Sequence, residues 1–311
     1  MINDIKENFE FVAIHYPFYK KEAIRISTSN KTSQQYQKFI NDNSIEMAEI
    51  IMSDLELLRN CPTLKHLKIS PSFDAKADFD FSPLYDAPEI ISLNCQNHYG
   101  DRNQYISTIH YDKINGLVDL FVNANKGALG FNRIATLKNL RIGGFKGKNN
   151  DVSDLFCSRE LDTLQLNDCK IQSLKGIDLS PKMQCLYLNY NRSLRNINDL
   201  KGVKETLKAL RIQNCPKIED FSVLGELEKL ELLELSGNNT LPNLDFLKAM
   251  KNLKTFVFNM NVLDGNLTLC LGLSYVYSER NRMHYNLKDA ELPKGKYVRG
   301  NEDIEEWRRL E

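Results

Sequence analysis

A repeating pattern of leucine-like residues constrains the fold of this chain more strongly than any other feature of its sequence. The template LxxLxLxx(N/C) fits six segments, which begin at residues 117, 161, 183, 207, 230 and 253. Partial matches begin at residues 64, 88 and 137, and six of the eight spacings between consecutive starts are 22, 23 or 24 residues. Self-similarity at one short period predicts a solenoid of stacked coils, in which each coil buries its apolar side against its neighbours.

The segment LDTLQLNDCKIQSL, residues 161–174, shows what one coil requires. Side chains alternate along a strand, so we expect Leu164 and Leu166 to point into the core and Gln165 to point out. Apolar residues then recur every three positions, which favours extended turns or 3-10 backbone on the return. The Asn or Cys at the ninth position can satisfy backbone groups of neighbouring coils. These residues would stack as a ladder of Asn125, Cys169, Asn191, Cys215, Asn238 and Asn261.

The pattern resembles the leucine-rich repeat family over about residues 60–278. The repeats are similar to a short class, of about 22 residues, found in bacterial internalins and in a protein-phosphatase regulatory subunit. The resemblance implies an α/β fold: a curved right-handed solenoid with parallel strands on its concave face and short helices, 3-10 turns and loops on its convex face.

The register predicts strands at residues 64–70, 90–95, 119–124, 139–143, 163–167, 185–189, 209–213, 232–236 and 255–259. One aspartate per coil recurs before the next strand, at Asp54, Asp80, Asp154, Asp199, Asp220 and Asp245. Asp is a preferred N-cap because its carboxylate accepts backbone N–H groups, so we expect short helices at these positions. A metal site is the weaker interpretation, because the spacing does not gather the carboxylates into a cluster.

A solenoid exposes an apolar face at each end and needs caps there. We assign residues 1–60 to an N-terminal cap, 61–278 to the solenoid and 279–311 to a C-terminal cap. In the first cap, FEFVAIHY and AIRIST are typical of strands and SQQYQKFIND of a helix. Ile24 and Ile26 could fill the inward positions of a degenerate coil, and IEMAEII could supply a second. NEDIEEWRRL predicts a terminal capping helix, with Trp307 as a core plug rather than a binding residue.

The charge balance argues against nucleic acid or an anionic membrane as partner. Lys plus Arg and Asp plus Glu are both 41, which gives a net charge of zero. No window approaches the ~18 apolar residues of a membrane span, and the N-terminus lacks the apolar stretch of a signal peptide. We therefore expect a cytoplasmic monomer whose seven cysteines are free thiols. Two of the four glycosylation sequons begin at Asn191 and Asn238, and burial in the ladder would keep both from carrying a glycan.

No catalytic constellation is visible. None of the five histidines lies in an HExxH motif, and GxSxG, Walker and GxGxxG motifs are absent from the sequence. The stretch IGGFKGK, residues 142–148, could bind phosphate, but a loop that needs positive φ is favoured. Cys185 takes an outward strand position and Cys95 could also be accessible, yet no histidine is in reach to activate either thiol. We expect no catalytic residue, no metal and no cofactor.

What remains is a surface, since outward strand positions line the concave face, the usual binding face of such repeats. Aromatic residues and arginine are enriched at interaction hot spots, and they recur at the strand centres. From Phe121 to Arg211 the strands would span ~19 Å, which suits a peptide or a protein loop. A merely solvated sheet face is the alternative. The candidate contact residues are Phe121, Arg141, Gln165, Tyr187, Arg211, Glu234, Asn167, Asn189 and Gln213.

The sequence thus favours a non-enzymatic scaffold that binds a protein or peptide on its concave face. An intracellular inhibitor or immunity-type protein is one form of this hypothesis. A secreted or surface adhesin of internalin type is the alternative if the reading frame starts upstream of Met1. An enzyme whose chemistry lies in the N-terminal 60 residues is the third class, and assays with hydrolase substrates would discriminate it.

Overall fold

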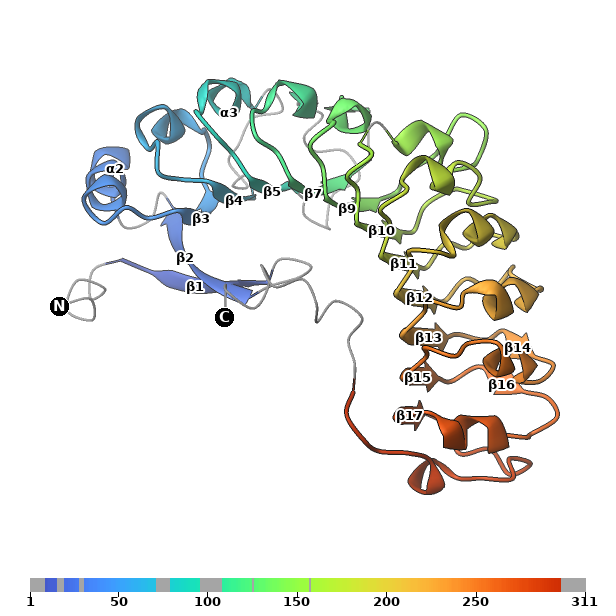
Figure 1. The fold of residues 1–311 in the computed structure, drawn as a ribbon. Coiled ribbons are helices and arrows are strands. Elements are labelled where there is room, and N and C mark those ends of the chain that lie inside the picture. Colours follow the sequence, from blue (N-terminus) through green and yellow to red (C-terminus); the bar gives the residue numbers. More distant parts are fainter. Residues whose placement is uncertain are drawn as a thin grey trace. The chain divides into compact units, whose positions relative to one another are not determined.

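A computed structural model describes residues 9–15, 20–27, 31–70, 79–95, 108–124, 126–156 and 158–297. The chain forms two compact units, and the division between them falls between Arg141 and Ile142 of the sequence. We call them the first and the second unit. In each unit the strands lie on one side and the helical turns on the other (Figure 1).

The strands of the first unit follow one another in the sheet in their order along the chain, apart from β6 and β8. They are β1 (Phe11–His15), β2 (Lys20–Ser27), β3 (Met47–Ile51), β4 (His66–Ile69), β5 (Ser92–Cys95), β7 (Asp119–Asn123) and β9 (Asn139–Gly143), which reaches the division. β1 pairs antiparallel with β2, and the pairs from β2 to β7 are parallel. The returns carry α2 (Ser33–Asp42), η2 (Glu56–Asn60), α3 (Ser82–Asp86), η3 (Tyr111–Lys113) and η4 (Phe131–Arg133). A short separate pair joins β6 (Ile109–His110) to β8 (Ala128–Leu129).

The second unit repeats a more regular coil. Its parallel strands are β10 (Thr163–Asn167), β11 (Cys185–Asn189), β12 (Ala209–Gln213), β13 (Leu232–Ser236), β15 (Thr255–Phe258) and β17 (Tyr275–Ser278). The returns are 3-10 turns: η5 (Ser153–Leu155), η6 (Ile177–Leu179), η7 (Asn198–Val203), η8 (Ser222–Glu226), η9 (Asp245–Lys248), η10 (Thr268–Gly272) and η11 (Asp289–Glu291). A short pair, β14 (Thr240–Leu241) with β16 (Asn261–Val262), extends two neighbouring coils.

The predicted strand register is confirmed. All nine predicted strands are present, and their ends differ from the prediction by two residues at most. Leu164 and Leu166 are both 0% exposed, as the inward positions of a coil must be. The expected first coil is also present, since Ile24 and Ile26 are fully buried and β2 pairs with β3 in parallel. The predicted terminal helix and Trp307 lie outside the described residues, and the three domain boundaries remain predictions.

The ladder is confirmed in the middle of the second unit. Asn191 is fully buried; its Oδ1 accepts the N–H of Cys169 at 2.8 Å, and its Nδ2 donates to the carbonyl of Leu166 at 3.0 Å. The thiol of Cys169 points at the carbonyl of Ile142, at 3.7 Å, and that of Cys215 at the carbonyl of Leu188, at 3.6 Å. Each ladder residue therefore binds backbone of a neighbouring coil.

The ladder prediction is wrong at Asn238, which is exposed. Asn239 is 8% exposed instead, and its Nδ2 donates to the carbonyls of Cys215 and Ile218. Gly237, with a φ of 141°, leaves the strand in a conformation that none of the other coils described by the structure uses at this point, so the ladder shifts by one residue. Asn261 is only half-buried, and Asn125 lies outside the described residues.

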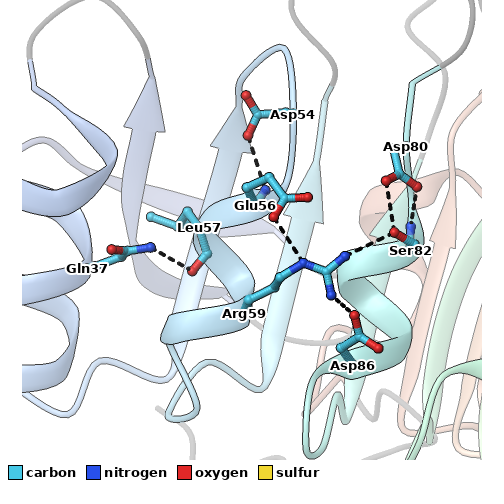
Figure 2. A network of polar contacts seen from close by, with 8 residues as sticks. All are labelled: Gln37, Asp54, Glu56, Leu57, Arg59, Asp80, Ser82 and Asp86. Atoms are coloured by element: carbon cyan, nitrogen blue, oxygen red, sulfur yellow. Dashed lines mark hydrogen bonds and ion pairs between the residues drawn. The ribbon is translucent and has the colours of Figure 1, made fainter.

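The prediction of capping aspartates is right in part, although the aspartates that bind a helix start lie one residue before the N-cap, which is Leu55, Phe81 or Phe221. Asp54, Asp80 and Asp220 accept backbone N–H groups two residues further on, from Glu56, Ser82 and Ser222. In three other coils the predicted aspartate is not the capping residue, because the equivalent bond goes to Asp151, Asn196 or Asn243. Figure 2 shows the first two capping carboxylates beside Arg59, whose guanidinium binds Glu56, Ser82 and Asp86 and so ties η2 to α3.

Candidate functional site

Four of the candidate contact residues of the second unit, Gln165, Tyr187, Arg211 and Glu234, lie in one row across its sheet, on the face that points away from the core, and Val257 and Tyr277 continue this row. Parallel pairing places Gln165, Tyr187, Arg211, Glu234, Val257 and Tyr277 opposite one another on successive strands. We call these residues the central row. Tyr277 is 41% exposed and the other five are half-buried, so the row is accessible along its length.

Arg211 is held in place within this row. Its Nε lies against Oε2 of Glu234, and its guanidinium lies 5.3 Å from the centre of the Tyr187 ring. Burial acts to lower the pKa of the Arg211 guanidinium, but the hydrogen bond and charge of Glu234 outweigh it and raise that pKa above its ordinary value. The predicted hot-spot arginine is thus charged, and its guanidinium is already held in one orientation by Glu234.

A contact that the sequence analysis missed covers part of this face. The segment Pro293–Tyr297 runs beside β17, where the carbonyl of Pro293 accepts the N–H of Val276 and the N–H of Gly295 donates to Ser274. The Tyr297 hydroxyl donates to Oε1 of Glu234 at 2.7 Å, and its ring meets the Tyr275 ring edge-on at 5.2 Å. No repeat signal marks Tyr297, because it lies 63 residues from its partner and outside the repeat register.

Cys185 is the clearest correction at the site. It does take an outward strand position, but it is 0% exposed, because Cys185, Ala209 and Leu232 form an apolar cluster against which Tyr187 and Tyr297 pack. Burial raises the pKa of the Cys185 thiol to about 12. Cys95, also expected to be accessible, is 6% exposed, and burial raises its thiol pKa to about 12 as well. A thiol with such a pKa is not an activated nucleophile.

The amides on the carboxyl-terminal side of the central row are partly bound to one another. Oδ1 of Asn167 accepts hydrogen bonds from Nε2 of Gln165 at 3.1 Å and from Nδ2 of Asn189 at 2.9 Å. Asn189 is only 7% exposed, whereas Asn167 and Gln213 are half-buried. A partner would therefore meet a fixed amide surface here rather than loose side chains.

Phe121 and Arg141 belong to the first unit and pair with each other. The guanidinium carbon of Arg141 lies 4.0 Å from the centre of the Phe121 ring. Phe121 is 5% exposed, so the prediction that it offers an exposed aromatic surface is wrong. Arg141 is half-buried. The sequence could not reveal this, because strand alternation gives the direction of a side chain but not what covers it.

A polar row on the first unit contains residue types used by hydrolases, but not in a catalytic order. Ser92 Oγ donates to Oδ2 of Asp119 at 2.7 Å, and Nδ1 of His66 lies 3.0 Å from the same hydroxyl. A catalytic serine needs its proton taken by a histidine that a carboxylate orients. Here the serine lies between the two and is 0% exposed. The described residues hold no group of three or more His, Cys, Asp or Glu that could bind a metal.

The glycine-rich stretch at residues 142–148 is a turn, as favoured. Gly144 has a φ of 67°, and the backbone N–H of Lys148 donates to the carboxylate of Asp154 at 2.7 Å. A carboxylate at this N–H opposes a second anion, which argues against the phosphate-binding alternative. Within the part of the chain that the structure describes, no helix is long and apolar enough to cross a membrane.

Comparison with solved structures identifies the fold. The crystal structure of the internalin InlF from Listeria monocytogenes strain 4b F2365 superposes with a TM-score of 0.53 at 17% identity, covering 82% of this chain and 73% of that one. The functional domain of InlJ from Listeria monocytogenes, whose description mentions a cysteine ladder, gives a TM-score of 0.45 at 16% identity, covering 70% of this chain and 48% of that one. No protein-family model and no curated protein sequence matches the chain.

Proposed function

Because this chain has the leucine-rich repeat fold, an α/β solenoid of parallel strands and short returns, we propose that it is a protein-binding scaffold that uses the outer sheet face of its second unit. The central row carries this proposal. It presents Tyr187 and Arg211 on the neighbouring strands β11 and β12 and Tyr277 on β17, three strands further along the sheet, and these residue types supply much of the energy at protein interfaces.

The length and rigidity of the row fit a protein segment. From Gln165 to Tyr277 there are five strand steps, and at ~4.8 Å per step they span ~24 Å, longer than most metabolites. The side chains sit on strands whose backbone is hydrogen-bonded on both sides, and Glu234 holds Arg211 in one orientation. A preorganised surface loses less side-chain entropy on binding, so more of the contact energy appears as affinity.

The finer form of the proposal is an inhibitor or immunity-type protein that masks an enzyme or toxin, since masking needs a fitted surface and no chemistry. We propose the cytoplasm as its compartment. In support, Cys169 and Cys215 use their thiol hydrogens in the ladder, so the coils require reduced cysteines.

The test is affinity capture from the source cells with quantitative mass spectrometry. Tyr277→Ala and Tyr187→Ala alter the outer sheet face, and we expect each to reduce capture of the native partner at least tenfold. Leu179→Ala is the matched control, because Leu179 is an exposed apolar residue, 49% exposed, on the helical side of the same unit.

Melting curves of all three variants keep folding and binding apart. We leave Arg211→Ala out of this set, because it would strand the 13% exposed Glu234 carboxylate without its guanidinium and so perturb the fold. Loss of the partner with Leu179→Ala, together with normal capture by both tyrosine variants, would place binding on the helical side and refute the proposal.

A further inference from the structure

The contact made by Tyr297 defines a slot on the outer sheet face. Its floor is the apolar cluster of Cys185, Ala209 and Leu232, each 2% exposed or less. Tyr187 packs against the same cluster, and Tyr275 meets the inserted Tyr297 ring edge-on. Above the floor, Oε1 of Glu234 accepts the phenol hydroxyl. The slot therefore combines an apolar surface for a ring with one acceptor at the distance of a phenol oxygen.

This combination discriminates among side chains. Leucine or phenylalanine would fill the floor but leave the Glu234 carboxylate without the donor, and a hydrogen bond to a charged group is worth more than one between neutral groups. Glu234 cannot turn away to avoid the loss, because Arg211 holds its other oxygen. Lysine or arginine could meet the carboxylate but would bring charge and its hydration onto the apolar floor. A tyrosine satisfies both parts.

We propose that this slot takes a tyrosine side chain of the protein partner, and that Tyr297 is a built-in competitor that fills the slot when no partner is bound. The inference rests on the proposed function and adds the chemistry of its central contact. Tyr297 is itself half-buried, so the filled slot stays open to solvent and an incoming tyrosine can replace the resident one without unfolding a core.

The loss of partner affinity caused by competition from Tyr297 can be estimated. A segment tethered beside its own site acts at an effective concentration of about millimolar, so even a weak contact keeps the slot mostly filled. If the slot is open about one tenth to one hundredth of the time, a partner binds the wild-type protein roughly tenfold to a hundredfold more weakly than a protein whose slot is empty. Tyr297→Ala supplies that empty slot in the full-length chain.

The probe is a phage-displayed library of random peptides, selected in parallel on three full-length baits. These are the wild-type protein, Tyr297→Ala, and the double variant Tyr297→Ala with Ala209→Met. The methionine grows from the floor into the space that the Tyr297 ring leaves, so it blocks the slot while Arg211 and Glu234 stay intact. We expect peptides selected on Tyr297→Ala to share a tyrosine. As synthetic peptides they should bind this variant at least tenfold more tightly than either other bait.

A second arm tests the hydrogen bond. Replacing the shared tyrosine of a selected peptide by phenylalanine keeps the ring and removes the donor to Glu234, so affinity for Tyr297→Ala should fall about tenfold. A selection without tyrosine enrichment on Tyr297→Ala, or peptides that bind it and the wild type equally, would overturn the inference. A Tyr297→Ala protein that does not fold would do the same, since it would make the segment an integral part of the fold.

The outcomes of the peptide selection can be told apart from those of the affinity capture that tests the proposed function. If Tyr277→Ala loses the native partner but no tyrosine is enriched, the sheet face binds and the slot inference fails. If tyrosine peptides are selected while both sheet-face variants capture the native partner normally, the slot chemistry stands and the proposed site of the native partner fails.

Discussion

Moving the ladder from Asn238 to Asn239 has an energetic consequence that unfolding experiments can measure. Asn239 is 8% exposed and its Nδ2 donates to the carbonyls of Cys215, at 3.1 Å, and Ile218, at 2.8 Å. Asn239→Ala removes both hydrogen bonds: the carbonyl of Ile218 loses this donor, whereas the carbonyl of Cys215 keeps the backbone N–H of Ile218 at 3.3 Å. A net hydrogen bond is worth ~1 kcal/mol and an unsatisfied buried acceptor costs more, so we expect a loss of about 2–3 kcal/mol.

Two further variants give a higher and a lower reference for the stability loss expected of Asn239→Ala. Asn191→Ala removes a fully buried amide that both donates and accepts, so its cost should be similar or larger, at about 3 kcal/mol. Asn238→Ala changes an exposed side chain and should cost less than ~0.5 kcal/mol. Asn238 is the matched control, because the repeat template gives it the ladder position.

Urea unfolding followed by circular dichroism measures all three variants against the wild type. With an m-value of ~2 kcal/mol per molar urea, Asn239→Ala should lower the midpoint by about 1 M and Asn238→Ala by less than about 0.3 M. The reasoning is refuted if Asn238→Ala shifts the midpoint as far as Asn239→Ala does, since the ladder would then follow the template and not the structure.

Three other predictions follow from the same coils. Leu166→Ala, at a fully buried position, should cost about 2–5 kcal/mol, whereas its outward neighbour Gln165→Ala should cost under ~0.5 kcal/mol; equal midpoints in urea would contradict the strand alternation. In a Cys157→Ser background the six described cysteines should not react with a thiol reagent at pH 8 in the native protein, because they are buried and burial raises the thiol pKa of each to about 11 or 12. Mass spectrometry that finds rapid labelling would show that these burials are wrong. Tyr190→Asn should raise the free energy of unfolding by about 0.5–1 kcal/mol, because Tyr190 has a φ of 59°, which asparagine adopts at lower cost. A lower melting temperature of the variant would mean that the exposed ring of Tyr190 makes a stabilising contact.

The strands were predictable because each coil repeats the same physical requirement. Leu164 and Leu166 must face the core in one coil, and Leu186 and Leu188 must do so in the next, so nine matches reinforce one register. The returns were less predictable, because several residue types can cap the same turn. Asp220, Asn243 and Asp151 all accept an N–H two residues ahead, and a search for aspartate alone finds only part of the column.

The repeat template also does not predict the backbone conformation of single residues, and the reason is a different one. Gly144, Asp168, Tyr190, Asn214 and Gly237 all have positive φ where the chain leaves β9, β10, β11, β12 and β13, respectively. Glycine, asparagine and aspartate are the types that tolerate this conformation, so four of these five could have been read from the sequence. Tyr190 could not, because a tyrosine gives no such signal.

The candidate site shows where local patterns stop being informative. Alternation correctly sends Cys185 and Tyr187 to the same face of β11, but it cannot say that one is 0% exposed and the other half-buried. The difference arises because Tyr297 and its neighbours lie over the amino-terminal side of the face, and this contact spans 63 residues without any periodicity. The open part of the face is therefore the central row and the amides beyond it. A partner that needs more area must displace the Pro293–Tyr297 segment. Tyr297, which lies outside the repeat pattern, therefore controls how much of the outer sheet face is available.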